Sequence, residues 1–222
     1  MRIWIDNGHG AGTKGKQSPD GRLREYAYAR DIARRVVDAL KKKGLDAQLL
    51  VPEEEDISLQ ERCARANRVK DSILVSVHCN AAGSGTQWMT ARGWEAWTSV
   101  GQTKADKLAE CLYQSAEQVL KGMKIRKDTA DGDSDKESGF YILKHTVCPA
   151  VLTENLFQDN REDVDFLLSD EAARRLSRCM CRESVNTWAY ETASVDTGRL
   201  AVGRAPLFAF LPWMRVAAVW AG

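Results

Sequence analysis

The sequence predicts a single α/β domain, with a mostly parallel six-stranded sheet flanked by helices on both faces. Three observations favour this class. Short apolar runs bounded by turn residues recur along the chain, and stretches of helical period lie between them. The length of 222 residues suits one substantial core rather than two. Strands that alternate with helices are typical of parallel sheets covered on both faces, whose ligand sites lie at the carboxyl ends of the strands.

The expected elements follow from these patterns in chain order. Strands are expected at 2–6, 46–51, 73–78, 93–98, 139–143 and 149–154. Helices are expected at 22–43, 58–70, 103–121 and 170–190. Helix 22–43 is the clearest, because its apolar residues form one stripe. The three lysines 41–43 suit the negative end of its dipole, and Gly44 ends it.

Composition excludes some classes of function. The 32 basic and 31 acidic residues give a net charge of +1, which argues against a nucleic-acid partner. The sequence shows no internal repeat and no low-complexity tract. The six cysteines lack C-x-x-C spacing, which favours reduced thiols. The first residues do not resemble a secretory signal, so the route of export is left open.

The glycine-rich stretch IDNGHGAGTKGKQS matches two phosphate-binding patterns in its order of residues. Gly10–Gly15 matches G-x-G-x-x-G, and Gly10–Lys16 matches G-x-x-x-x-G-K. Both patterns require a helix to begin directly after the last glycine. Here Pro19 and Gly21 make a turn instead, and Gln17 lacks the hydroxyl that would bind magnesium. We therefore expect the glycines to let the backbone fold tightly around His9.

Metal-capable side chains stand at or just beyond three strand ends, namely His9, His78 and Glu154. Each alone has an ordinary explanation as a capping or packing residue. A fourth, Glu25, falls inside the apolar arc of helix 22–43, one turn from its start. A carboxylate directed at the core needs a cation or hydrogen-bond donors. A salt bridge to a neighbouring arginine, or shelter at the helix N-terminus, is the alternative to a metal.

Two histidines and one glutamate make the ligand set of a catalytic zinc site, which keeps a fourth position for water. Zinc chemistry of this kind also needs a base within reach of that water. Glu154 is the acid that remains at a strand end. The residues therefore favour His9, Glu25 and His78 as ligands and Glu154 as the base.

Four segments also resemble a known family. IDNGHG, REYAYAR, VSVHCNA and PAVLTENLFQDN occur in the order and approximate spacing of zinc-dependent N-acetylmuramoyl-L-alanine amidases of the amidase-3 type, from residue 1 to about 190. The resemblance implies a six-stranded sheet and one zinc ion per chain. It places His9, Glu25 and His78 at the metal ligands and Glu154 at the catalytic glutamate.

The same resemblance implies a substrate and a place of action. The enzyme would cut the amide between N-acetylmuramic acid and L-alanine in peptidoglycan, and so would act on the cell wall. Because no export signal is visible, we expect either that the signal has been removed or that the protein is released from the cytoplasm by another route, as a phage-type lysin is. The oligomeric state is not predicted.

Weaker candidates surround these four residues. Asn80 is expected to brace the loop behind His78, with a turn residue as the ordinary explanation. Asp6 and Asn155 are further candidates to support the metal ligands or to contact the substrate, and Asn155 stands where family members often have a small residue. His145 matches no family ligand and is expected to be a loop or surface histidine.

The predicted catalytic domain spans residues 1–191, and residues 192–222 form an apolar tail. Pro212 and Arg215 argue against a membrane span there, so we expect a segment docked on the domain or a partner. Contact with a membrane surface is the alternative.

Two other functions are alternatives to the amidase. A carboxypeptidase-like zinc hydrolase usually has its first histidine and glutamate three apart, whereas His9 and Glu25 are 16 apart (25 − 9). A non-catalytic peptidoglycan-binding regulator would be expected to lack Glu154 or a ligand.

Overall fold

A computed structural model describes residues 1–181, which contain one six-stranded sheet in the order β2-β1-β3-β6-β4-β5. The strands are β1 (Arg2–Asp6), β2 (Asp46–Leu49), β3 (Ser72–Asn80), β4 (Trp94–Thr98), β5 (Lys136–Glu137) and β6 (Ala150–Phe157). Only the pairing of β4 with β6 is antiparallel in this part of the chain. The sheet is therefore mostly parallel, as expected.

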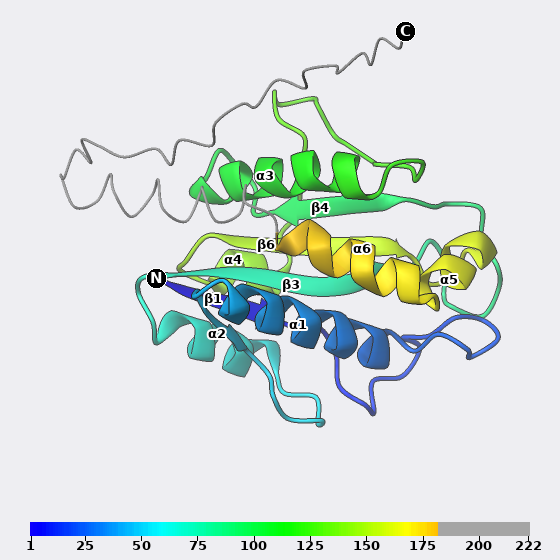
Figure 1. The fold of residues 1–222 in the computed structure, drawn as a ribbon, viewed down its shortest axis with the longest axis horizontal. Coiled ribbons are helices and arrows are strands. Elements are labelled where there is room, and N and C mark those ends of the chain that lie inside the picture. The colour runs from blue at the N-terminus through cyan, green and yellow to red at the C-terminus, as the bar shows by residue number, and fades with distance from the viewer. Residues whose placement is uncertain (182–222) are drawn as a thin grey trace, which may run out of the picture.

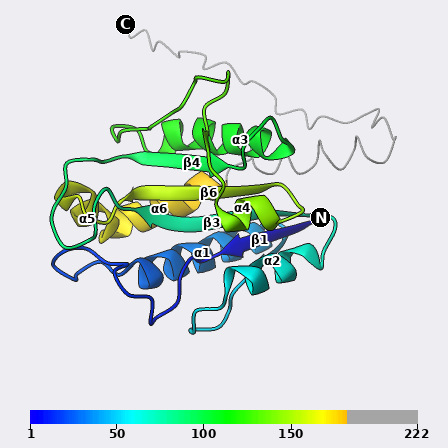
Figure 2. The ribbon, with the colours of Figure 1, turned by 180° about the vertical axis from the view of Figure 1, so that it is seen from behind.

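Helices cover both faces of the sheet (Figure 1). Three helices, α1 (Glu25–Lys42), α3 (Lys104–Val119) and α6 (Asp170–Met180), lie side by side on one face. The view from behind shows α2 (Leu59–Asn67) and α4 (Tyr141–His145) on the other face (Figure 2). The short α5 (Arg161–Leu167) follows β6. None of the helices in residues 1–181 is long and apolar enough to span a bilayer.

Two hydrophobic clusters fill the two faces. The larger lies under α1, α3 and α6 and includes Ile5, Val36 and Leu108, all almost fully buried. The smaller lies under α2 and α4 and includes Leu74 and Ile142. The apolar stripe of α1 faces the larger cluster, as its 3.6-residue period predicts. Helices therefore cover both faces of the sheet, which leaves the ends of the strands as the place where a site can form.

One predicted strand is wrong. Residues 139–143 (GFYIL) do not form a strand; Tyr141–His145 form α4, which buries the adjacent residues Ile142 and Leu143 together. Adjacent side chains share one side of a helix turn but point to opposite faces of a strand. The sixth strand is β5 instead, within the loop 128–138, and it pairs through Trp97 and Lys136.

The other boundaries differ by a few residues. Helix α1 begins at Glu25 rather than at residue 22, and α5 was not expected. Helix α6 ends at Met180, inside the predicted span 170–190. The predicted domain boundary at 191 and the tail 192–222 lie outside the described residues, so both stay predictions.

Candidate metal site and catalytic glutamate

The loop after β1 brings His9 to the carboxyl edge of the sheet in a constrained backbone. His9 has φ +24° and Gly8 has φ +47°. A Cβ placed on Gly8 would lie 2.7 Å from Cε1 of His78. Glycine is required here both by its φ and by this close approach. No helix starts between Gly15 and Glu25, which is inconsistent with a phosphate-binding loop.

Glu25 is the first residue of α1 and is only 1 % exposed. Its Oε1 lies 3.0 Å from Nδ1 of His78 and 3.4 Å from Nε2 of His9, and it accepts a hydrogen bond from the Cys79 backbone N–H at 3.1 Å. The other oxygen, Oε2, is buried and has no hydrogen-bond partner among the described residues. The glutamate predicted to point inward therefore does so, toward both histidines rather than toward an arginine.

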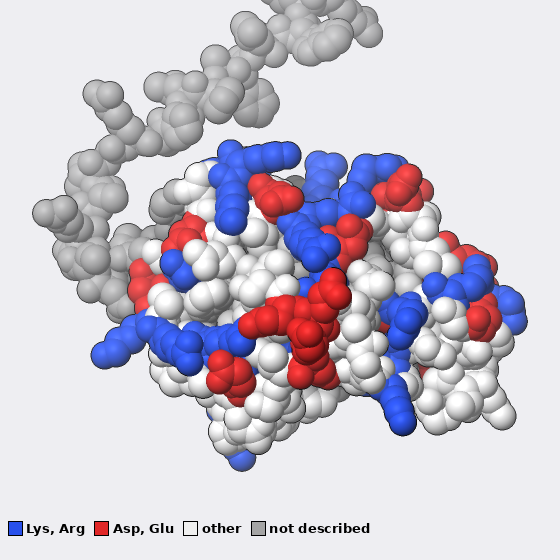
Figure 3. Space-filling model, turned by 90° about the horizontal axis from the view of Figure 1, so that it is seen from below, with Lys and Arg blue, Asp and Glu red and all other residues white. Residues whose placement is uncertain are grey.

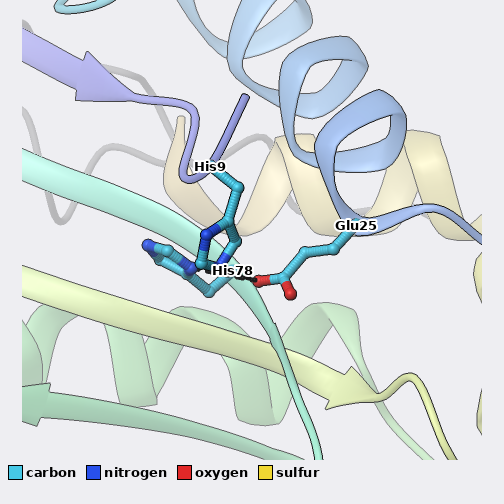
Figure 4. A group of neighbouring side chains, drawn as sticks. All are labelled: His9, Glu25 and His78. Carbon is cyan, nitrogen blue, oxygen red and sulfur yellow. Dashed lines mark hydrogen bonds and ion pairs between the residues drawn. The ribbon is translucent and has the colours of Figure 1, made fainter. Parts of the chain in front are cut away.

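The three side chains converge from three elements (Figure 4). One ligand atom from each of His9, Glu25 and His78 lies within 4.8 Å of the others. The two imidazole rings meet edge to face, with centroids 5.0 Å apart. No other group of this kind occurs within residues 1–181. Residues 69 positions apart (78 − 9) thus form one cluster that can hold a cation.

Electrostatics keep Glu25 ionised within this cluster. Burial disfavours the charged form of Glu25, but hydrogen bonds from His78 and His9 outweigh burial and hold its pKa well below the usual range. Burial likewise lowers the pKa of His78, and the hydrogen bond to Glu25 more than reverses this, so the pKa is raised. Glu25 is therefore an ionised carboxylate at neutral pH.

A hydrogen-bonded chain orients the His78 ring from behind. Nε2 of His78 lies 3.1 Å from the Ser76 hydroxyl, which donates to Oδ2 of Asp6 at 2.6 Å. Because Ser76 gives its proton to Asp6, it accepts from Nε2–H, and the ring presents Nδ1 toward Glu25. Asp6, predicted from sequence only as a weak candidate to support the ligands or contact the substrate, thus acts on His78 through Ser76.

Arg62 of α2 anchors this chain, and sequence reasoning missed it. The side chain is 2 % exposed and forms a salt bridge with Asp6. Its Nη2 donates to Asp56 at 3.0 Å and to the backbone oxygen of His9 at 3.4 Å. One guanidinium therefore supports both histidines. A signal existed, since Arg62 shares a helix face with Ala66, four residues later on the buried side of α2.

Glu154 stands on β6 directly beside His78 on β3, its partner in the parallel register. Burial raises the pKa of Glu154 to about 8; the charge of His78 opposes this rise, whereas Glu25 and Glu95 add to it. Its Oε2 is buried without a hydrogen-bond partner among the described residues. Glu154 is thus close to the cluster but is not one of its three members.

Asn155 and Asn80 hold the strands around Glu154. Asn155 is fully buried; it donates to the backbone oxygen of His78 and accepts from Nε1 of Trp94, each at 3.0 Å. Asn80 donates to Oε1 of Glu95 at 2.7 Å and accepts from the Ala81 N–H at 2.8 Å. Both side chains therefore tie neighbouring strands or loops together near the cluster.

Glu95 is a second residue that sequence reasoning missed. It is buried opposite Glu154 in the β4–β6 register, and it pairs with Arg126 at 2.6 Å and Lys136 at 3.1 Å. A buried acid flanked by tryptophans in GWEAW was the available signal. His145, by contrast, is exposed at the end of α4, where its ring stacks on Tyr141 at 4.1 Å.

Comparisons with known proteins agree with this architecture. Residues 3–183 match the model of the N-acetylmuramoyl-L-alanine amidase family, Amidase_3. The chain is 30 % identical over 175 residues to the endolysin of Bacillus phage SPP1, covering 76 % of this chain and 59 % of the endolysin. It is 26 % identical over 178 residues to the amidase CwlM of Bacillus licheniformis, covering 80 % of this chain and 65 % of CwlM. The chain thus spans about three fifths of each relative's length.

Solved structures share the fold. The amidase AmiC2 of Nostoc punctiforme superimposes with a TM-score of 0.72 at 24 % identity, covering 86 % of this chain and 97 % of that one. An amidase from Clostridium difficile 630 gives 0.68 at 25 % identity, covering 89 % and 97 %. The family match extends over most of the chain and includes all four residues discussed above. The chain belongs to the N-acetylmuramoyl-L-alanine amidase family.

Proposed function

We propose that this protein hydrolyses the amide bond between N-acetylmuramic acid and L-alanine of peptidoglycan, using one zinc ion held by His9, Glu25 and His78. The observation that carries the proposal is the convergence of these three side chains beside Glu154 on the neighbouring strand. Family membership supplies the class of bond. The place of action is accordingly the cell wall.

The donor set fits zinc in chemistry, and its ligand atoms lie close enough together to contact one ion. Tetrahedral zinc with bonds of about 2.0–2.1 Å separates its ligand atoms by roughly 3.3 Å. Oε1 of Glu25 lies 3.0 Å from one imidazole nitrogen and 3.4 Å from the other, on either side of that value. The unpartnered Oε2 of Glu25 leaves capacity for a cation. Three protein ligands are typical of catalytic sites rather than structural ones.

When bound, zinc would activate a water molecule and polarise the carbonyl of the scissile amide. Glu154 is the proton carrier in this proposal. It accepts a proton from the attacking water and then donates it to the alanine nitrogen as the C–N bond breaks. Burial favours the protonated form of Glu154, which the second step requires, and a bound cation would favour the ionised form, which the first step requires.

Asp6, Ser76 and Arg62 are proposed as positioning residues for the histidines. Ser76 and Asp6 fix the orientation of His78, and Arg62 holds Asp6 together with the His9 backbone. Asn155 and Asn80 are proposed to hold β3, β6 and β4 in the register that brings Glu154 beside His78.

Hydrolysis of purified peptidoglycan by the Glu154→Gln variant tests the role of Glu154. We expect turnover to fall by at least about 100-fold while zinc content stays at one per chain, because a general base is lost but no ligand is. Products are identified by mass spectrometry, which shows the bond that is cut, and wild type with a chelator is the control. Near-normal turnover by the variant would reject the role of Glu154. A product other than free L-alanyl peptide would reject the amidase proposal itself.

A further inference from the structure

A pocket of about 590 Å³ opens beside the proposed metal site, between the start of α2 and the start of α4. Its lining includes His9 and His78 but neither Glu25 nor Glu154. The pocket therefore extends from the histidine side of the cluster. Its volume lies within the range of about 300–1,000 Å³ usual for sites that bury a small molecule.

The rim of this pocket is apolar. Leu59 of α2 and Phe140 before α4 both line it, and they are 47 % and 39 % exposed. Tyr141 and Leu152 add further apolar surface. Exposed apolar side chains that together line a concave surface, rather than standing singly, indicate a binding site.

The polar groups of the pocket already have partners within the protein. Arg62 is occupied by Asp6, Asp56 and the His9 carbonyl, and the Ser58 hydroxyl accepts the Glu61 N–H at the start of α2. Asp56 keeps 41 % of its side chain exposed at the pocket. The pocket therefore offers an anionic ligand no unpaired cation among its described lining residues, and Asp56 repels one. An uncharged ligand with an apolar face is the better match.

The two halves of the proposed substrate differ in charge. Assigning one of them to the pocket rests on the proposed function. Glu154 protonates the leaving nitrogen, so the stem peptide leaves on the Glu154 side. The acyl half is a lactyl group attached to the sugar, and the two histidines that would hold the ion polarising its carbonyl line the pocket. The sugar is neutral once its lactyl carboxyl is in the amide, whereas the stem peptide carries carboxylates.

We propose that this pocket is the sugar subsite of the enzyme. It binds the N-acetylated pyranose ring of the muramoyl group, with the apolar face of the ring against Phe140 and Leu59. Aromatic side chains are suited to such a face because they present a large rigid apolar surface at small entropic cost.

Two substrates that share the scissile amide test this subsite. One is N-acetylmuramoyl-L-alanyl-D-isoglutamine, and the other is D-lactoyl-L-alanyl-D-isoglutamine, which lacks the sugar. KM and kcat are measured for the zinc-loaded wild type and for the Phe140→Ala and Leu59→Ala variants. Leu168→Ala is the matched control, since Leu168 is 46 % exposed at the end of α5, outside the pocket.

We expect Phe140→Ala and Leu59→Ala to raise KM for the muramoyl substrate about tenfold with little change in kcat, because they remove binding that is uniform along the reaction. KM for the lactoyl substrate is expected to stay within about twofold of the wild-type value, and Leu168→Ala to affect neither. Equal effects on both substrates would overturn the subsite. Circular dichroism melts check that each variant folds, and Leu59→Ala decides the question if Phe140→Ala does not.

A binding measurement separates this proposal from the proposed function. Saturation-transfer NMR with a neutral chitotetraose and the Glu154→Gln protein is expected to show contacts that Phe140→Ala abolishes and Leu168→Ala retains. If the wild type cleaves neither substrate but these contacts are seen, the catalytic proposal fails and the sugar subsite stands. If it cleaves both equally well and no contacts are seen, the subsite fails and the catalytic proposal stands.

Discussion

At the scale of single residues, the site depends on groups that never meet a metal ion. His78 is oriented by Ser76, Ser76 by Asp6, and Asp6 by Arg62. Each link places a donor against an acceptor, so the order of the chain decides which ring nitrogen faces Glu25. Because these groups are buried, losing one partner leaves another unsatisfied.

The Ser76→Ala variant tests this orientation with the smallest disturbance. It removes the acceptor for Nε2 of His78 while Arg62 and Asp6 remain paired. We expect zinc affinity, measured by competition with a chromophoric chelator, to fall about 10–100-fold. Ser72→Ala on the same strand is the control, because the Ser72 hydroxyl donates to the Val69 carbonyl instead. Equal zinc affinities for the two variants would show that the chain does not orient His78.

Asp135 makes a separate prediction about pH. It is 2 % exposed, accepts from the Thr98 hydroxyl at 2.6 Å, and has its pKa raised to about 7, chiefly by burial. A carboxyl whose folded pKa lies above its unfolded value of about 3.8 binds more protons when folded. Its contribution is therefore favourable at low pH and is lost as pH rises through about 7.

The Asp135→Asn variant should accordingly be more stable than wild type at pH 8, by a few degrees in Tm, with a smaller difference at pH 4. Thermal melts at the two pH values measure this. Asp131→Asn, at an exposed position in the same loop, should show no such change. A stabilisation that does not grow between pH 4 and pH 8 would contradict the assignment.

At the scale of elements, capping determines where the helices begin. Helix α3 starts with a capping box, in which the Thr103 hydroxyl accepts the Ala105 N–H at 3.1 Å and Asp106 accepts the Thr103 N–H. This helix packs Leu108 and Leu112 against the sheet beneath β4. Its cap therefore supports the strand that holds Glu95 opposite Glu154.

The Thr103→Ala variant should lower the free energy of unfolding by about 1 kcal/mol, the usual cost of losing an N-cap. Urea denaturation measures the difference, and Thr129→Ala, in an exposed stretch of loop, is the control. Zinc affinity should not change, since α3 contributes none of the three ligands. Equal stabilities of the two variants would show that the cap is not stabilising.

Elements with a strong period could be predicted from the sequence, and elements defined only by tertiary contacts could not. The angle of Glu25 on α1 placed it correctly because an 18-residue helix has a clear apolar arc. The run GFYIL has too few residues to separate strand from helix, and the packing of Ile142 and Leu143 decided for a helix. Strand β5 is two residues long and carries no pattern, since it exists only as a partner of β4.

The site shows the same division. The placement of His9, His78 and Glu154 near one another could be predicted because strand ends are visible in the sequence. Arg62 and Ser76 could not be connected to them, because their roles depend on contacts across α2, β1 and β3. Long-range polar pairs of this kind leave no periodic trace.

At the scale of the whole molecule, one face carries acidic and basic side chains next to each other. Figure 3 shows acidic side chains gathered near the middle of one face, with basic side chains around them. The near balance of 32 basic and 31 acidic residues agrees with this picture. The face in view has no continuous basic stripe of the kind that tracks a polyphosphate backbone.

Metal removal gives a prediction for the whole fold. A ligand that binds only the folded state stabilises it by about 2.7 kcal/mol at 100 times its dissociation constant. We expect zinc to raise Tm and a chelator to reverse the rise, as measured by differential scanning calorimetry. In the Glu25→Gln variant, Tm should be nearly the same with zinc as with the chelator. A wild-type Tm that is indifferent to zinc would contradict binding at this cluster.

The position of β6 in the sheet has a consequence for synthesis on the ribosome. This strand is made late, yet it lies between β3 and β4 and is the only described strand that joins them. A nascent chain that ends before residue 150 contains one group of strands, β1, β2 and β3, and a second group, β4 and β5. It lacks the strand that pairs with both groups. The three proposed ligands can be translated long before Glu154, so the complete proposed site is among the last features that translation can deliver.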